Sequence, residues 1–147
     1  MKPAFQKLAL ELDKIPNGYP KTESGVELKL LEKLFTPEEA ELAASLSLIP
    51  ESVSEVAQKN KITELEAKRI LIAMVKKGLI ELRKDSDKGL VFFLMPFVVG
   101  FYERQNGKID QEFAELFEQY YKEGFFQSMT AEPSVHRVIP VEKTIPV

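Results

Sequence analysis

Two groups of glutamates have the spacing that general acid–base catalysis or divalent-cation binding would use. Carboxylates three residues apart lie on one face of a helix, where a pair can share a proton or a metal ion. The first group is Glu38, Glu39 and Glu41, and the second is Glu112, Glu115 and Glu118. Carboxylates at such positions also complement the positive end of a helix and solvate its exposed face. We expect this structural use, and therefore no catalytic residue and no metal site.

Other residue types that carry enzyme chemistry are scarce. The 147 residues include no cysteine and one histidine, His136. A thiolate nucleophile, a zinc site with cysteine ligands and a cysteine-held iron–sulfur cluster are therefore excluded, and a Ser-His-Asp relay is disfavoured. The seven glycines stand singly, so there is no glycine-rich phosphate loop. We predict a protein that is not an enzyme and that holds no cofactor in this chain.

Basic residues gather in one segment of an otherwise acidic chain. The formal net charge is −3, but residues 59–89 contain nine basic and five acidic side chains. A basic segment of this kind is a candidate electrostatic footprint for nucleic acid. Whether these basic residues can face one ligand depends on the helices, strands and turns that position them.

Three Ser or Thr residues are each followed, three positions later, by a glutamate. This is the capping-box pattern with which a helix begins. The pairs are Thr36 with Glu39, Ser52 with Glu55 and Thr63 with Glu66. They predict helices over residues 37–46, 53–59 and 64–77, and Gly78 should end the last of them.

Two apolar stretches, residues 79–83 and 90–95, flank a polar, turn-forming segment and predict a β-hairpin. A brief strand is also expected within residues 46–50. Three helices followed by a hairpin is the order of a winged helix-turn-helix. Apolar periodicity predicts further helices over residues 3–15, 25–35, 97–105 and 110–122, and the chain should be extended from Thr130 onward.

The predicted fold class is mainly α with a small β-hairpin, a winged helix-turn-helix with additional N- and C-terminal helices. Residues 1–20 form an N-terminal helix and turn, and residues 21–96 form the winged-helix domain. Residues 97–126 are C-terminal helices that pack on this domain, and residues 127–147 are an extended tail or linker. The length and composition fit one self-supporting globular domain.

An aromatic stripe runs along the predicted helix 110–122. We interpret it as core or dimer packing rather than as a ligand cage. A homodimer through the C-terminal helices is therefore one expectation. The candidate partner-binding residues are those of the stripe together with one isoleucine on the outward line of helix 64–77, namely Phe113, Phe117, Tyr120, Tyr121 and Ile72.

Longer stretches of the sequence are more specific than its periodicity. They are residues 19–28, 34–43, 77–80, 95–103 and 137–141. Together they resemble the N-terminal region of ferredoxin-type 4Fe–4S iron–sulfur proteins of anaerobic bacteria and archaea. In that family a winged-helix domain precedes a cysteine-rich cluster domain, and this chain lacks the cysteine motifs. The resemblance implies either a part of a longer protein, with the 4Fe–4S clusters in the missing C-terminal part, or a cluster-free relative.

Two functions follow as expectations. The first is a docking or regulatory module of a ferredoxin-like electron-transfer protein, whose partner is a redox or regulatory protein or its own cluster domain. The alternative is a transcriptional regulator that binds duplex DNA through helix 64–77 and the hairpin. The candidate nucleic-acid contacts are Lys61, Lys68, Arg69, Arg83, Lys84 and Lys88. Glu64 and Glu66 at the start of that helix weigh against DNA, and an outward Ile72 favours a protein neighbour.

The expected location is the cytoplasm. Charged residues interrupt the N-terminal apolar stretch early, so it does not read as a secretory signal. The most apolar run, residues 90–102, is too short to span a bilayer and contains Pro96. We therefore expect no membrane partner.

Overall fold

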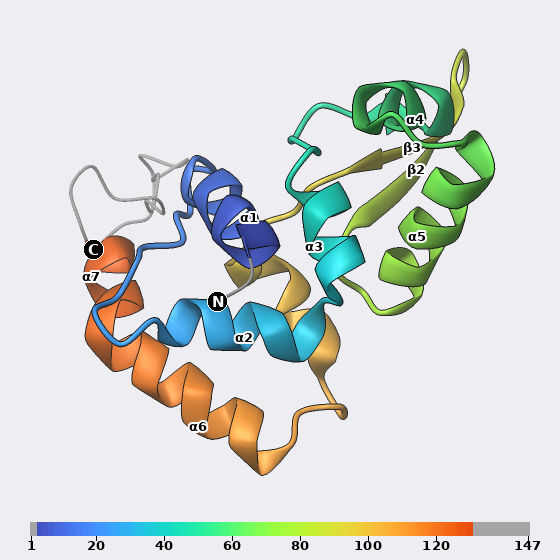
Figure 1. Ribbon diagram of the computed structural model, residues 1–147. Helices are drawn as coiled ribbons and strands as arrows, with labels where there is room; N and C mark the ends of the chain where they lie inside the picture. The colour runs from blue at the N-terminus through green and yellow to red at the C-terminus, as the bar shows by residue number, and fades with distance from the viewer. Residues whose placement is uncertain (1–2, 131–147) are drawn as a thin grey trace, which may run out of the picture.

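The computed structural model describes residues 3–130 and shows a mainly helical protein with a small three-stranded antiparallel sheet (Figure 1). Its regular elements are α1 (Pro3–Asp13), α2 (Val26–Leu34), α3 (Pro37–Ala43), β1 (Glu51–Ser52), α4 (Val53–Asn60), α5 (Glu64–Lys76), β2 (Glu81–Asp85), β3 (Gly89–Phe93), α6 (Gln111–Tyr120) and α7 (Phe126–Thr130). In Figure 1, α1, α2 and α6 form one half of the molecule, while α4, α5 and the sheet form the other. Helix α3 joins the two halves because it packs against both α1 and α5.

The three predicted capping boxes are confirmed. At the start of each of α3, α4 and α5, the Ser or Thr hydroxyl accepts a hydrogen bond from the glutamate N–H three residues later. The glutamate side chain in turn accepts from the backbone N–H of the capping residue. These reciprocal bonds satisfy backbone donors that a helix N-terminus would otherwise leave open.

The sheet has the strand order β1-β3-β2, with both pairs antiparallel. The predicted hairpin is confirmed as β2 and β3, in register with Leu82 opposite Phe92. Its turn is fixed by Asp85, whose carboxylate accepts from the N–H groups of Asp87 and Lys88 at 2.8 and 2.9 Å. These two N–H groups lower the pKa of Asp85.

One hydrophobic core cluster includes buried residues from α1, α2, α3, α5, the sheet and α6. Phe97 lies near its centre and is 1% exposed. The rings around it have centroids 5.2 to 6.2 Å from its own, and they belong to Tyr19, Phe101, Tyr102, Phe117, Tyr120 and Phe125. The N-terminal and C-terminal segments therefore share their packing with the central helices.

The C-terminal helical stretch covers α2 (Figure 1). The Tyr120 hydroxyl donates to the Pro20 carbonyl at 3.0 Å, and the Tyr19 and Tyr120 rings stack at 5.1 Å. Lys33 of α2 pairs with Asp110 and Glu112 at the start of α6. The stretch continues through a π-helical turn, η3 (Tyr121–Phe125), into α7.

Three predicted elements are wrong or displaced. Residues 97–105 form no regular helix: η1 (Phe97–Phe101) has extended backbone at Val98 and Val99, and a short 3-10 turn, η2 (Glu103–Gln105), follows. Two β-branched residues followed by a glycine disfavour a helix there. The brief strand lies at residues 51–52 rather than within 46–50, and residues 127–130 are helical rather than extended. The rest of the predicted tail, residues 131–147 with His136, lies outside the described residues.

Within residues 3–130, each helix is either too short or too polar to cross a lipid bilayer.

Candidate functional site

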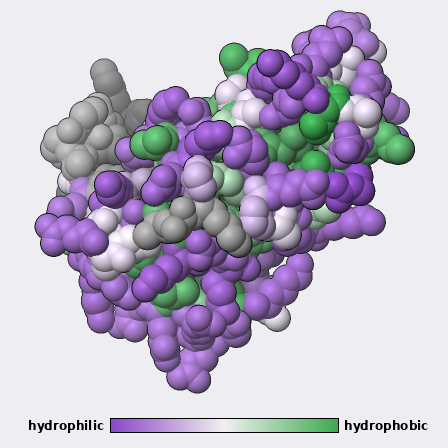
Figure 2. All heavy atoms as spheres, in the orientation of Figure 1, coloured by the Kyte–Doolittle hydropathy of each residue, from purple (hydrophilic) through white to green (hydrophobic). Residues whose placement is uncertain are grey.

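An open groove lies between the beginning of α4, the beginning of α5 and the hairpin. Two residues of the basic segment, Lys68 of α5 and Lys88 of the hairpin turn, line this groove. Apolar residues are exposed here: Leu65 in the first turn of α5 is 81% exposed and Leu90 of β3 is 42% exposed. Figure 2 shows hydrophobic residues between hydrophilic ones on the surface of this half. The groove is lined by Ser52, Val53, Ser54, Glu64, Leu65, Lys68, Lys88 and Leu90.

Three of the six candidate nucleic-acid contacts are engaged within the chain. Arg69 donates to Glu38 of α3 at 2.8 Å, and Lys88 donates to Glu55 of α4 at 2.7 Å. The Arg83 guanidinium lies 5.0 Å from the centre of the Phe93 ring. Binding a phosphate with these side chains would first require these contacts to be given up.

The other three candidates, Lys61, Lys68 and Lys84, are exposed. Within residues 3–130 none of their side chains forms a hydrogen bond or an ion pair. Lys61 ends α4 in the left-handed conformation, with φ of 56°. Lys68 lines the groove beside Leu65, whereas Lys84 lies on the edge strand β2. The basic charge still free to bind a ligand is therefore small and spread out.

The negative charge at the start of α5 disfavours phosphate binding there. Glu64 and Glu66 both lie in its first turn. The Thr63 N–H and hydroxyl bind the Glu66 carboxylate and lower its pKa. A capped carboxylate therefore takes the place that an anion would occupy at the positive end of this helix.

The candidate partner-binding residues separate into buried and exposed positions. Phe113 and Tyr120 are 4% and 0% exposed, so their side chains belong to the core of this chain and present almost no surface to a partner. Phe117 and Ile72 are half-buried against the same core. Only Tyr121, at 42% exposed, presents a substantial aromatic surface. The exposed apolar residue of α5 is thus Leu65 rather than Ile72, and it lies about two helical turns nearer the N-terminus of the same helix.

The ion pair between Lys88 and Glu55 links the hairpin to α4. Glu55 accepts from the Lys88 ammonium and from the Ser52 backbone N–H, each at 2.7 Å. These contacts lower the pKa of Glu55 from its ordinary 4.5 to about 2. They therefore stabilise the fold above about pH 4.5, and this contribution is lost as the pH falls toward 2.

We expect Glu55→Gln to make the protein less sensitive to acid. Because the variant lacks this titrating group, its melting temperature should fall less than that of the wild type between about pH 6 and about pH 3. Thermal unfolding followed by circular dichroism at both pH values measures the difference. Glu32→Gln is the control, since Glu32 is exposed and its side chain has no hydrogen bond or ion pair within residues 3–130. An equal acid sensitivity of Glu55→Gln and wild type would contradict the assignment.

The glutamates Glu38, Glu39 and Glu41 and the glutamates of α6 do not assemble into a metal site. Within residues 3–130 no three side chains of the metal-ligating types come together. Glu39 binds the Thr36 N–H and Lys77, Glu41 binds Lys7, and Glu118 binds Lys122.

Comparison with protein-family models, with curated proteins and with solved structures finds no match for this chain.

Proposed function

We propose that this chain is a non-catalytic winged helix-turn-helix module that docks a protein partner through the groove beside α5. Its helix order supports a winged helix: α3, α4 and α5 are followed directly by the β2-β3 hairpin, with β1 as the third strand. The resemblance of the sequence to ferredoxin-type proteins supports a redox protein, or a cluster domain of the same polypeptide, as the partner. The module then positions an electron carrier and carries no redox group itself.

The observation that carries the proposal is the exposure of Leu65. A leucine that is 81% exposed on the face where a DNA reader would present polar groups favours burial against a protein. Leu90 extends the apolar surface across the groove, and two carboxylates in the first turn of α5 disfavour phosphate. Interface cores are likewise apolar with a polar rim, and here Lys68, Lys88 and Glu64 form such a rim.

Site-specific photocrosslinking tests the docking face. A benzophenone amino acid at position 65, introduced in the source organism, should yield a covalent adduct with an iron–sulfur protein that mass spectrometry identifies. The control position is 10, because Leu10 is also largely exposed, at 65%, but lies on α1. Adducts of equal yield from both positions, or an adduct with nucleic acid from position 65, would contradict docking at this groove.

A second measurement tests the link to iron–sulfur proteins. The native protein, isolated under anaerobic conditions, should have a mass above the 16.7 kDa of this chain and should contain iron. A native mass of 16.7 kDa without iron would remove the ferredoxin part of the proposal and leave the docking groove to be judged by crosslinking alone.

The alternative function is duplex DNA binding. Three exposed lysines without ion-pair partners in the described part of the chain favour it, namely Lys61, Lys68 and Lys84. If these lysines contact phosphates, fluorescence anisotropy should show binding at low salt that weakens steeply as salt rises. Lys68→Glu with Lys84→Glu should then abolish the signal without lowering the melting temperature, because neither lysine is paired. Absence of binding to random duplex at low salt would remove this alternative.

A further inference from the structure

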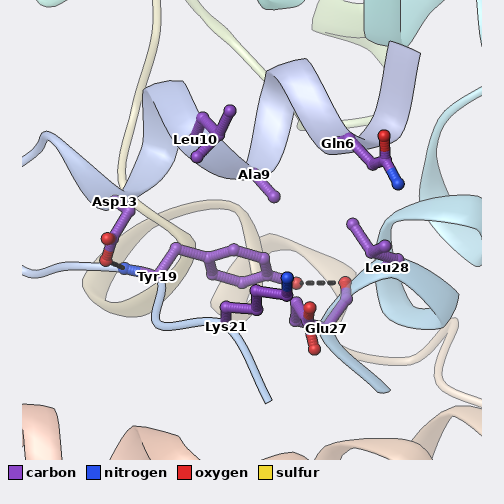
Figure 3. Close-up of a pocket in the computed structure, with 8 residues that line it drawn as sticks. All are labelled: Gln6, Ala9, Leu10, Asp13, Tyr19, Lys21, Glu27 and Leu28. Atoms are coloured by element: carbon purple, nitrogen blue, oxygen red, sulfur yellow. Dashed lines mark hydrogen bonds between the residues drawn. The ribbon is translucent and has the colours of Figure 1, made fainter. Parts of the chain in front are cut away.

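A cavity of about 280 Å³ lies between α1 and the beginning of α2 (Figure 3), in the other half of the molecule from the groove beside α5 (Figure 1). Its inner wall is buried: Tyr19, Glu27 and Leu28 are each less than 10% exposed. Its rim is exposed and includes Leu10, Asp13 and Lys21. The lining residues are Gln6, Ala9, Leu10, Asp13, Tyr19, Lys21, Glu27 and Leu28.

Glu27 is a carboxylate in the inner wall with 2% of its surface exposed. Its Oε2 atom accepts from the Thr22 N–H at 3.2 Å and from the Thr22 hydroxyl at 2.5 Å. Its Oε1 atom has no hydrogen-bond partner among residues 3–130. Since no buried side-chain oxygen of the described residues lacks a partner, Oε1 is open to solvent in the cavity, where it can accept a hydrogen bond from a ligand.

The cavity wall around Glu27 is apolar and held in place. The Tyr19 ring crosses the cavity in Figure 3, with its hydroxyl donating to the Glu27 carbonyl at 2.7 Å. The Tyr19 N–H donates to Asp13 at 2.9 Å, so the residue is fixed at both ends. Burial raises the pKa of Tyr19 well above its ordinary value, and the phenol is therefore a neutral donor. Ala9 and Leu28 complete the apolar wall.

The charges of the lining add up to −1, from Asp13, Glu27 and Lys21. Lys21 forms no ion pair with any residue of the described part of the chain. A divalent metal ion is disfavoured as the occupant, because such ions need several oxygen ligands and the wall offers apolar groups beside a single buried carboxylate. A monovalent organic cation fits both the charge and the apolar wall.

We propose that this cavity binds a small primary alkylamine as its ammonium ion, which donates to Glu27 while its alkyl chain covers Tyr19, Ala9 and Leu28. A primary ammonium supplies three donors, so it can satisfy Oε1 and still bind water or Asp13 at the rim. The Tyr19 ring adds a favourable face for a cation. This site is independent of the docking function proposed above, and it would make the module responsive to a metabolite that carries an amine.

Three probes of nearly equal size test the proposal on the full chain. Pentylamine should bind in isothermal titration calorimetry, whereas pentanol should bind at least about tenfold more weakly because it lacks the charge. Pentanoate should not bind, because its carboxylate would face Glu27. Equal affinities for pentylamine and pentanol, or no binding of pentylamine at millimolar concentration, would overturn the proposal.

Matched variants locate the site. Glu27→Gln keeps an oxygen for the Thr22 bonds but removes the charge, and it should weaken pentylamine binding by about tenfold or more. Glu23→Gln removes the same charge at an exposed position four residues away and should leave binding unchanged. If Glu27→Gln does not fold, Ala9→Leu serves instead, since a larger side chain on the α1 wall should fill the cavity and reduce binding. Unchanged binding in Ala9→Leu would overturn the site.

Discussion

Replacing Phe97 by alanine is expected to lower the free energy of unfolding by about 3–5 kcal/mol. The side chain is 1% exposed and is surrounded by aromatic rings from the loop after α1, from η1 and the tyrosine that follows it, and from α6 and η3. Its removal leaves a cavity. The surrounding rings cannot move in to fill it, because each ring is also held by other contacts. A loss of this size is a large fraction of the stability of a typical domain.

Urea unfolding followed by circular dichroism measures the effect of Phe97→Ala. The matched control is Phe126→Ala, since Phe126 is an aromatic residue of the same C-terminal region but is 49% exposed. Its loss should cost less than about 1 kcal/mol. Equal effects of the two substitutions would show that the aromatic cluster does not depend on Phe97.

Gly78→Ala is the second substitution with a large expected effect, about 2–4 kcal/mol of lost stability. Gly78 follows α5 with φ of +73°, a left-handed conformation that costs an L-residue about 1–2 kcal/mol. An added Cβ would also lie 2.9 Å from the Cβ of Arg104. Arg104 is held there by Glu81, and the Gln105 side chain donates to the Lys77 carbonyl at 3.0 Å, so the neighbour has little room to move.

Gly107→Ala separates the cost of the left-handed backbone conformation from the cost of the close approach to Arg104. Gly107 has a similar φ of +80°, but an added Cβ would meet nothing within 4 Å. It should therefore show the backbone cost alone, about 1–2 kcal/mol. Chemical denaturation of both variants gives the comparison, and a loss in Gly78→Ala no greater than in Gly107→Ala would refute the role of the close approach to Arg104.

The helices of this protein could be predicted where a local signal marks their start. Thr36, Ser52 and Thr63 each form bonds within four residues, so the sequence alone contains both partners of every cap. Strand β1 and residues 97–105 could not be predicted in this way. Two residues pair in β1 only because β3 lies beside them, and the extended backbone at Val98 and Val99 interrupts a stretch whose apolar periodicity predicts a helix.

The candidate site was predictable in its location but not in its chemistry. Two basic residues of 59–89, Lys68 and Lys88, do line one groove, but the partners of Arg69 and Lys88 lie 31 and 33 residues away in the sequence. No short sequence motif predicts ion pairs between residues so far apart in the sequence. The exposure of Leu65 was missed because apolar periodicity predicts an inward face of Ile70, Leu71, Met74 and Val75 without showing what covers the opposite face of the helix. Glu27 was missed because its burial depends on the segment before α2 folding over it.

The hydrogen bond from Tyr120 to the Pro20 carbonyl joins residues 100 positions apart. During synthesis the ribosome releases the N-terminal half long before the aromatic residues that complete its packing exist. Tyr19 and Phe97 therefore lack these ring partners until the segment around residues 113–125 has emerged, and exposed apolar surface of this kind makes a nascent chain prone to association with other chains. A polypeptide that stopped before α6 would carry the same unpacked surface permanently.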